Sequence, residues 1–264
     1  MRGVSDRPTA IRALAARPAE SALILDFDGV LSPIIEDPAA SALPEQAEAA
    51  LTRLAPALGV LAVISGRPAD FLTDRVRIAR VRLLGSYGIE QIEDGARHVD
   101  PAAQPWLGPV REATRELDER MAGAPGIRVE HKSVSVAVHW RQAPDQEAAA
   151  ERVRETAAEI AARTGLRLEP GKLVAELRPP IDADKGSAIR ALLAATTPTA
   201  AAYAGDDLGD IPALSAMRDS GGYALVVDHG SETDARLLAL ADETFPGTDA
   251  FAAWLTDLAD AIGR

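Results

Sequence analysis

The sequence contains no cysteine, which excludes disulfide bonds, thiolate metal sites and cysteine nucleophiles. Basic and aromatic residues are also scarce: 28 Lys and Arg stand against 40 Asp and Glu, and aromatic residues make up 4% of the chain. At a formal net charge of -12, the average surface repels polyphosphate backbones, and no basic stretch with interleaved aromatics reverses this locally. We therefore expect no nucleic-acid partner.

Long apolar runs are missing as well. Residues 1–30 carry Arg, Glu and Asp among short apolar runs, a pattern that fits neither a signal peptide nor a membrane span. We therefore expect a cytoplasmic protein with no membrane partner. An acidic protein that binds an anionic substrate must concentrate positive potential in a pocket, through a metal ion and a few Lys and Arg side chains.

The organisation of the chain indicates an α/β fold. Short apolar runs followed by Gly or Asp clusters alternate with Ala-rich helical patterns, which is typical of βαβ units around a parallel sheet. The predicted strands of this core are Ala22–Leu25, Val60–Ile64, Val81–Leu84, Ala200–Ala204 and Tyr223–Val227. The predicted helices are Pro44–Leu58, Arg67–Val76, Lys185–Ala195 and Asp210–Met217.

The middle of the chain has a different pattern. Val134, Val136 and Val138 alternate with small residues, as expected for a sheet with one solvated face. We predict a small α+β domain at 101–179, inserted into a core made of 1–100 and 180–264, with Pro179-Pro180 at the boundary. Its predicted helices are Pro105–Met121 and Pro144–Thr164, and its strands Ile127–His131, Val134–Trp140, Leu166–Glu169 and Leu173–Leu177.

Two carboxylates follow the first predicted strand. Asp26 and Asp28 come after the apolar residues 23–25, and Gly29 follows them. Residues two apart on a strand point to the same side, and the carboxyl end of a parallel strand opens onto the ligand crevice. Two acids there are unfavourable unless a cation lies between them. An ordinary Asp-Gly turn would explain Asp28 and Gly29, but it does not require Asp26.

This segment resembles the first motif of the haloacid dehalogenase superfamily of phosphatases, DxDG followed by Thr or Val. The resemblance implies a Rossmann-like parallel core. It also implies that Asp26 is a nucleophile that forms an aspartyl-phosphate, and that Asp28 protonates the leaving alcohol and then activates water. Asp26 and the backbone carbonyl of Asp28 would join a Mg²⁺ shell, because this hard cation prefers oxygen ligands.

The second and third signatures of the superfamily follow in order. Ser65, after the second predicted strand, resembles the hydroxyl that binds a phosphate oxygen, and Lys185 resembles the lysine that holds phosphate and nucleophile together. Each residue has a simpler interpretation: Ser65 as a helix cap and Lys185 as a solvated lysine. Their order at strand and helix ends favours the catalytic interpretation.

The fourth signature is an acidic cluster. Asp206, Asp207 and Asp210 resemble the GDDxxD motif, in which the first acid ligates Mg²⁺ and the other two support the metal site. Alternatively, these acids could simply favour a helix N-terminus. The family resemblance implies the metal site, with Asp26, Asp28 and Asp206 as its ligands.

The inserted region resembles a C2-type cap, a domain that closes over small substrates. Its segments resemble those of trehalose-6-phosphate phosphatases, which carry ExK…HxR and GKxVxExRP; the matching residues here are Glu130, Lys132, Arg141, Lys172 and Glu176. By that resemblance these five residues bind the hydroxyls of the disaccharide of trehalose 6-phosphate, and Arg67 helps to position it. Without the resemblance they would be surface charges on an exposed sheet. A turn near 132–133 would let Glu130, Lys132 and Arg141 share a face.

The sequence departs from the family at three positions. Tyr87 stands where the family usually has His, in a segment that resembles its GxHGxE strand end, and Gly209 and Ile211 stand where it has Thr and Glu. A related phosphatase with a different substrate is therefore an alternative, and that substrate would be sucrose phosphate, a glycosyl-phosphoglycerate or a hexose phosphate. A non-catalytic trehalose-6-phosphate sensor is a further alternative. We expect a monomer.

Overall fold

The computed structural model describes residues 8–35, 40–171 and 173–263, so the predicted substrate-binding residue Lys172 lies outside the described residues. The chain divides into two compact units. The first, here the core unit, consists of Met1–His98 and Ala183–Arg264; the second, here the cap unit, is Val99–Asp182. None of the helices described is both long and apolar enough to cross a lipid bilayer.

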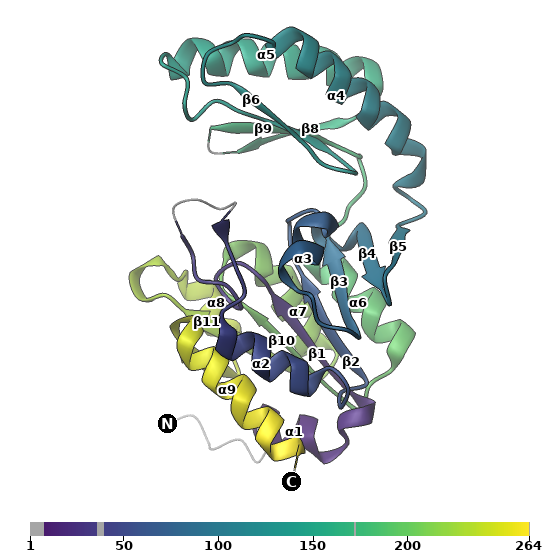
Figure 1. Cartoon of the computed structure of the whole chain (residues 1–264), viewed down its shortest axis with the longest axis vertical. Helices are drawn as coiled ribbons and strands as arrows, with labels where there is room; N and C mark the ends of the chain where they lie inside the picture. The colour runs from purple at the N-terminus through teal and green to yellow at the C-terminus, as the bar shows by residue number, and fades with distance from the viewer. Residues whose placement is uncertain (1–7, 36–39, 172, 264) are drawn as a thin grey trace. The chain divides into compact units, whose positions relative to one another are not determined.

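The core unit is built on one mixed sheet in the order β12-β11-β10-β1-β2-β3-β4-β5 (Figure 1). The strands from β12 to β3 are parallel, and β4 runs antiparallel to β3. This confirms the predicted α/β fold. The strands are β1 (Ser21–Asp26), β2 (Val60–Ile64), β3 (Val81–Gly85), β4 (Glu90–Glu93), β5 (Ala96–Val99), β10 (Ala200–Gly205), β11 (Tyr223–Asp228) and β12 (Glu243–Pro246).

Helices cover both faces of this sheet, which explains the continuous apolar run of β1. Leu23 and Leu25 pack with the helices α1, α2 and α9, whereas Ala22 and Ile24 pack with α6 and α7 on the other face. All six residues of β1 are buried, as expected for a central parallel strand. The helices are α1 (Ala10–Ala16), α2 (Glu45–Leu54), α3 (Ala69–Arg75), α6 (Lys185–Thr196), α7 (Ile211–Asp219), α8 (Ala235–Leu240) and α9 (Gly247–Ile262).

The cap unit contains a four-stranded antiparallel sheet in the order β6-β7-β9-β8, with two helices on one side (Figure 1). Val136, Val138 and Leu177 point to that side and pack with Leu117 and Ile160 of the helices. The period-2 pattern predicted this one-sided burial. The elements are α4 (Leu107–Met121), β6 (Arg128–His131), β7 (Val136–His139), α5 (Gln146–Thr164), β8 (Arg167–Gly171) and β9 (Val174–Arg178).

The structure adds elements that were not predicted, and it ends one helix earlier. The helix expected over Pro44–Leu58 stops at Leu54, where a series of turns begins. The strands β4 and β5 are short and largely polar, so they carry no apolar alternation. Their connection contains Asp94 and Gly95, both with positive φ, which is a hairpin signal that could have revealed them.

Candidate active site

Three chain segments bring polar residues to one edge of the core sheet. Asp26 ends β1 and lies opposite Ile64 of β2, so Ser65 leaves the next strand beside it. On the other side Leu25 pairs with Ala204 of β10, which places Asp206 just past the neighbouring strand end. The carboxyl ends of parallel strands on either side of β1 thus form the crevice that binds ligands in such sheets.

Lys185 forms a buried ion pair with the predicted nucleophile. It is the first residue of α6, after the N-cap Asp184, and its Nζ lies 2.8 Å from Asp26 Oδ2 and 2.6 Å from Asp210 Oδ1. Although burial opposes its charge, the carboxylates of Asp26 and Asp210 raise the pKa of Lys185 above its ordinary value. The side chain is 5% exposed, so Lys185 is not a solvated surface lysine.

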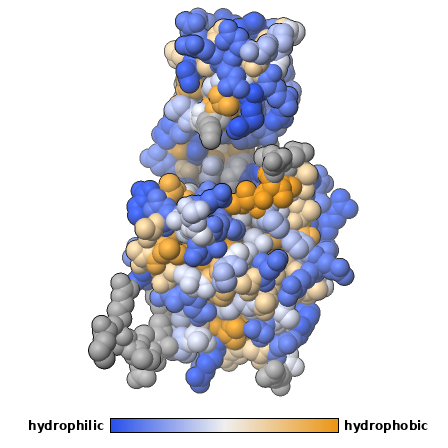
Figure 2. Space-filling model, turned by 90° about the vertical axis from the view of Figure 1, so that its left-hand side faces the viewer, coloured by the Kyte–Doolittle hydropathy of each residue, from blue (hydrophilic) through white to orange (hydrophobic). Residues whose placement is uncertain are grey.

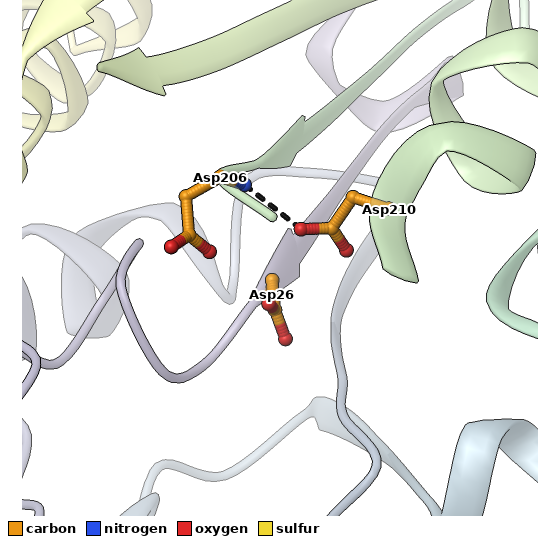
Figure 3. A group of neighbouring side chains, drawn as sticks. All are labelled: Asp26, Asp206 and Asp210. Carbon is orange, nitrogen blue, oxygen red and sulfur yellow. Dashed lines mark hydrogen bonds between the residues drawn. The ribbon is translucent and has the colours of Figure 1, made fainter. Parts of the chain in front are cut away.

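Asp210 fixes this arrangement. Besides Lys185, its carboxylate accepts hydrogen bonds from the hydroxyl of Tyr203 at 2.5 Å and from the backbone N–H groups of Asp206 at 2.8 Å and Asp207 at 3.1 Å. Figure 3 shows Asp210 reaching from the start of the helix toward the ends of β1 and β10. Because both of its oxygens are already engaged, Asp210 supports the site rather than offering a free ligand atom.

Asp206 has the properties expected of a metal ligand. Its Oδ1 is buried and has no hydrogen-bond partner among the described residues, and burial, together with the charge of Asp210, raises its pKa to about 8. Carboxylate oxygens of Asp26, Asp206 and Asp210 lie within 4.8 Å of one another (Figure 3). A hard divalent cation would stabilise the ionised form of such a buried group.

Gly29 permits this close approach. It has a φ of +77°, and a Cβ atom built on it would lie 2.0 Å from Asp206 Oδ2. Any larger residue would therefore displace the carboxylate of Asp206. The Gly of the DxDG segment is thus required by the packing of the acidic cluster as well as by its turn.

Asp28 lies beside the cluster but has other partners. Its carboxylate accepts hydrogen bonds from Arg67 Nε at 2.8 Å and Nη2 at 3.1 Å and from Ser41 Oγ at 3.1 Å. The Arg67 guanidinium also lies 4.7 Å from the centroid of the Phe71 ring. Arg67 also lines the cavity described below, so its predicted role in positioning the substrate stays a prediction.

Ser65 is not a helix cap. The helix α3 begins at Ala69, with Pro68 before it and no side-chain cap, whereas Ser65 Oγ accepts a hydrogen bond from the backbone N–H of Arg67 at 3.1 Å. Ser65 instead lines a cavity of about 350 Å³. The other residues around that cavity are Asp26, Asp28, Ile34, Gly66, Arg67, Tyr87, Lys185, Asp206, Asp207 and Gly209.

In the cap unit, three of the predicted sugar-binding residues lie on one face of the sheet. Glu130 and Glu176 lie opposite Ala137 on either side of β7, and Lys132 Nζ lies 3.0 Å from Glu176 Oε1. A turn separates β6 and β7, with the Lys132 N–H donating to the Ser135 carbonyl. The turn that would let these residues share a face, which the sequence left open, is therefore present.

Two further residues lie on this face: His139, the His of the segment that resembles HxR, and Ser135, which was not predicted from the sequence. Ser135 Oγ donates to Glu176 Oε1 at 2.6 Å, and His139 Nε2 lies 2.7 Å from Glu130 Oε2. The hydrogen bond from His139 lowers the pKa of Glu130 to about 2. A signal for Ser135 was available, because it alternates with Val134 and Val136. Arg141 follows β7 in an exposed turn, and no contact between its side chain and these pairs is found in the described part of the chain.

The surface of the cap unit is polar. The exposed large apolar side chains among the described residues are Ile34, Ile35, Leu208 and Leu238, and all belong to the core unit. Figure 2 shows the visible surface of the cap unit mostly in blue, the colour of hydrophilic residues, whereas orange residues are more frequent on the core unit. The polar groups of this sheet face are the charged and hydroxyl side chains described above.

Comparisons with known proteins agree with this geometry. The model of the trehalose-phosphatase family matches residues 24–242. The trehalose-phosphate phosphatase of Mycobacterium marinum is 37% identical over 253 residues, which cover 90% of this chain and 63% of that protein. The chain thus spans less than two thirds of the length of this relative.

Solved structures show the same fold. The crystal structure of a trehalose-6-phosphate phosphatase related protein has a TM-score of 0.74 at 23% identity, covering 90% of this chain and 97% of that one. A haloacid dehalogenase-like hydrolase from Bacteroides thetaiotaomicron has a TM-score of 0.61 at 15% identity, covering 90% and 99%. The extent of the family match and the identity to the mycobacterial relative establish that this chain belongs to the trehalose-phosphatase family.

Proposed function

We propose that this chain hydrolyses trehalose 6-phosphate through an aspartyl-phosphate on Asp26. The observation that carries the proposal is the Asp26 carboxylate at the end of β1, buried against Lys185 beside the cavity. An anion can attack a phosphate ester only where positive charge offsets the repulsion between them. Lys185 supplies part of that charge and, because Asp210 anchors it, holds it in place with little reorganisation.

The chemistry has two halves. In the first, an Asp26 oxygen forms a bond to phosphorus while the bond from phosphorus to the sugar oxygen breaks, and Asp28 gives a proton to that oxygen. In the second, Asp28 takes a proton from water, whose oxygen displaces Asp26 and releases inorganic phosphate. Arg67 would keep the Asp28 carboxyl group oriented in both halves, and Ser65 would hold a phosphate oxygen.

Asp206, Asp26 and the backbone carbonyl of Asp28 would hold a Mg²⁺ ion, with Asp207 and Asp210 in support. One buried oxygen of Asp206 has no hydrogen-bond partner within the described parts of the chain, and this oxygen together with the all-oxygen donor set supports a hard cation. When bound, Mg²⁺ shields the charge of the phosphoryl group. We expect EDTA to abolish turnover and added Mg²⁺ to restore it. Full activity after exhaustive chelation would contradict the metal site.

The sugar hydroxyls would be bound by five residues of the cap unit: Glu130, Lys132, Glu176, Arg141 and Lys172. Paired hydroxyls suit carboxylate and ammonium partners because charge-assisted hydrogen bonds are the stronger kind. The first three are already gathered on one sheet face, which supports a common ligand.

A panel of sugar phosphates tests the substrate. Phosphate release from trehalose 6-phosphate should exceed that from sucrose phosphate, a glycosyl-phosphoglycerate and glucose 6-phosphate, measured under identical conditions. If trehalose 6-phosphate is hydrolysed no faster than glucose 6-phosphate, the proposed substrate is wrong. If no ester is hydrolysed but trehalose 6-phosphate binds, the sensor alternative is favoured. The expected monomeric state and cytoplasmic location stay predictions.

A further inference from the structure

Tyr87 lines the catalytic cavity but has no role in the proposed chemistry. It lies in the short turn Ser86–Gly88 that follows β3. Ser86 and Tyr87 have φ angles of 51° and 61°, so two successive non-glycine residues adopt the left-handed conformation. Such conformations persist only where the surroundings enforce them, and they cluster at functional sites.

The surroundings enforce this conformation through several hydrogen bonds. The Ser86 N–H donates to the Arg67 carbonyl at 2.7 Å and the Tyr87 N–H to the Ser65 carbonyl at 2.9 Å. Ser86 Oγ donates to Oε2 of Glu90 at 2.8 Å, and Glu90 is fully buried. The turn is therefore tied directly to the backbone of the Ser65–Arg67 segment, and Tyr87 is held there in a fixed position.

The phenol group of Tyr87 lies against Gly66. A Cβ atom built on Gly66 would lie 2.8 Å from Cζ and 2.9 Å from the hydroxyl oxygen of Tyr87. Only glycine leaves room for the phenol at this distance. The hydroxyl therefore lies beside Gly66, the residue that follows Ser65, and both Tyr87 and Ser65 line the cavity.

The charges around the cavity explain why such a donor is needed. The two cationic side chains that line it are already engaged, Lys185 with Asp26 and Asp210 and Arg67 with Asp28. A phosphoryl group presents several anionic oxygens, each of which needs a hydrogen-bond donor once it leaves water. A phenol hydroxyl can donate to such an oxygen without adding charge.

We propose that the Tyr87 hydroxyl donates a hydrogen bond to an oxygen of the phosphoryl group that is transferred to Asp26. This inference rests on the proposed function, and it makes Tyr87 a phosphate-positioning residue rather than a contact to the sugar.

The substitution Tyr87→Phe tests the hydroxyl alone, because it keeps the ring against Gly66. We expect the affinity for inorganic phosphate, measured by isothermal titration calorimetry in Mg²⁺ buffer, to fall about 10- to 100-fold, the range for a hydrogen bond to a charged group. The value of kcat/KM should fall by a similar factor for trehalose 6-phosphate and for p-nitrophenyl phosphate. Tyr87→His retains a ring donor, so it should recover part of the loss.

A matched control is Tyr223→Phe, which removes a hydroxyl that donates to the Pro8 carbonyl at 2.9 Å. It should leave phosphate affinity and kcat/KM unchanged. Unchanged phosphate affinity in Tyr87→Phe would overturn the inference, and so would a loss confined to trehalose 6-phosphate, which would indicate a sugar contact. If the wild type binds phosphate through Tyr87 but hydrolyses neither ester, the proposed function fails while the inference stands. A wild type that binds no phosphate overturns the inference.

Discussion

The two groups of charged residues differ in how firmly they are held. In the core unit, the side chains of Asp26, Lys185 and Asp210 are 6%, 5% and 0% exposed, and they lie at the ends of packed strands and helices. In the cap unit, the side chains of Glu130 and Glu176 are 31% and 28% exposed, and they lie on an open sheet face. The first group is fixed by the core, whereas the second can exchange partners with water.

This difference matches the two tasks that we propose. Nucleophilic attack depends on the position of the nucleophile to within a fraction of an ångström, so a buried, fully hydrogen-bonded anchor such as Asp210 is required. Sugar recognition only exchanges one charge-assisted hydrogen bond for another. Partly exposed pairs permit that exchange with a small desolvation penalty.

The largest effect is expected in the core unit. In Asp26→Asn the amide keeps the shape of the side chain but is not a nucleophile, so turnover should fall by at least about four orders of magnitude. Single-turnover phosphate release measures this loss, and calorimetry with trehalose 6-phosphate should show that binding persists. Substantial residual hydrolysis would remove Asp26 from its proposed role.

The second prediction concerns stability. Asp210→Asn removes one of the two anionic partners of the buried Lys185, and breaking a buried ion pair is destabilising by about 3 kcal/mol or more. Urea unfolding should show this loss as a lower midpoint. Asp260→Asn is the control, because its ion pair with Arg53 is exposed, and its midpoint should hardly change. Equal midpoints for the two variants would contradict the anchoring role of Asp210.

How firmly a residue is held by the packed strands also determines whether its position could be predicted from the sequence. The positions of Asp26, Ser65 and Asp206 follow from the backbone, because each comes at the end of a parallel strand and those ends meet at one edge. The α/β fold and the one-sided cap sheet follow in the same way from the apolar patterns. Backbone placement is therefore where sequence reasoning is strongest.

Contacts between long side chains could not be predicted in this way. Arg67 follows β2 closely, yet nothing in its sequence position indicates that its guanidinium pairs with Asp28. The left-handed conformation of Tyr87 is similarly hidden, since it depends on hydrogen bonds to residues about 20 positions away in sequence. Side-chain rotamers and strained turns are determined by tertiary packing, which local sequence patterns do not predict.

A smaller effect is expected in the cap unit. Lys132→Ala should lower kcat/KM for trehalose 6-phosphate by about 10-fold, because a charge-assisted hydrogen bond to the sugar is lost, and should leave p-nitrophenyl phosphate nearly unaffected. Arg115→Ala is a suitable control, since it removes an exposed ion pair with Glu119 on a helix of the same unit. Equal losses on both esters would count against sugar recognition by the cap sheet.

The smallest effect concerns the pH dependence of the Glu130–His139 pair. Because the folded pKa of Glu130, about 2, lies below its ordinary value of 4.5, the pair stabilises the fold above the ordinary pKa, and this stabilisation is lost as the pH falls toward 2. With partial exposure taken into account, we expect about 1 kcal/mol. The difference in unfolding free energy between the wild type and Glu130→Gln should therefore be largest near neutral pH and should shrink by about pH 3. A difference that stays constant across this range would mean that the pKa of Glu130 is the same in the folded and unfolded chains. The charge of Glu130 would then contribute nothing to the stability of the cap unit, and its pair with His139 would be held by packing alone.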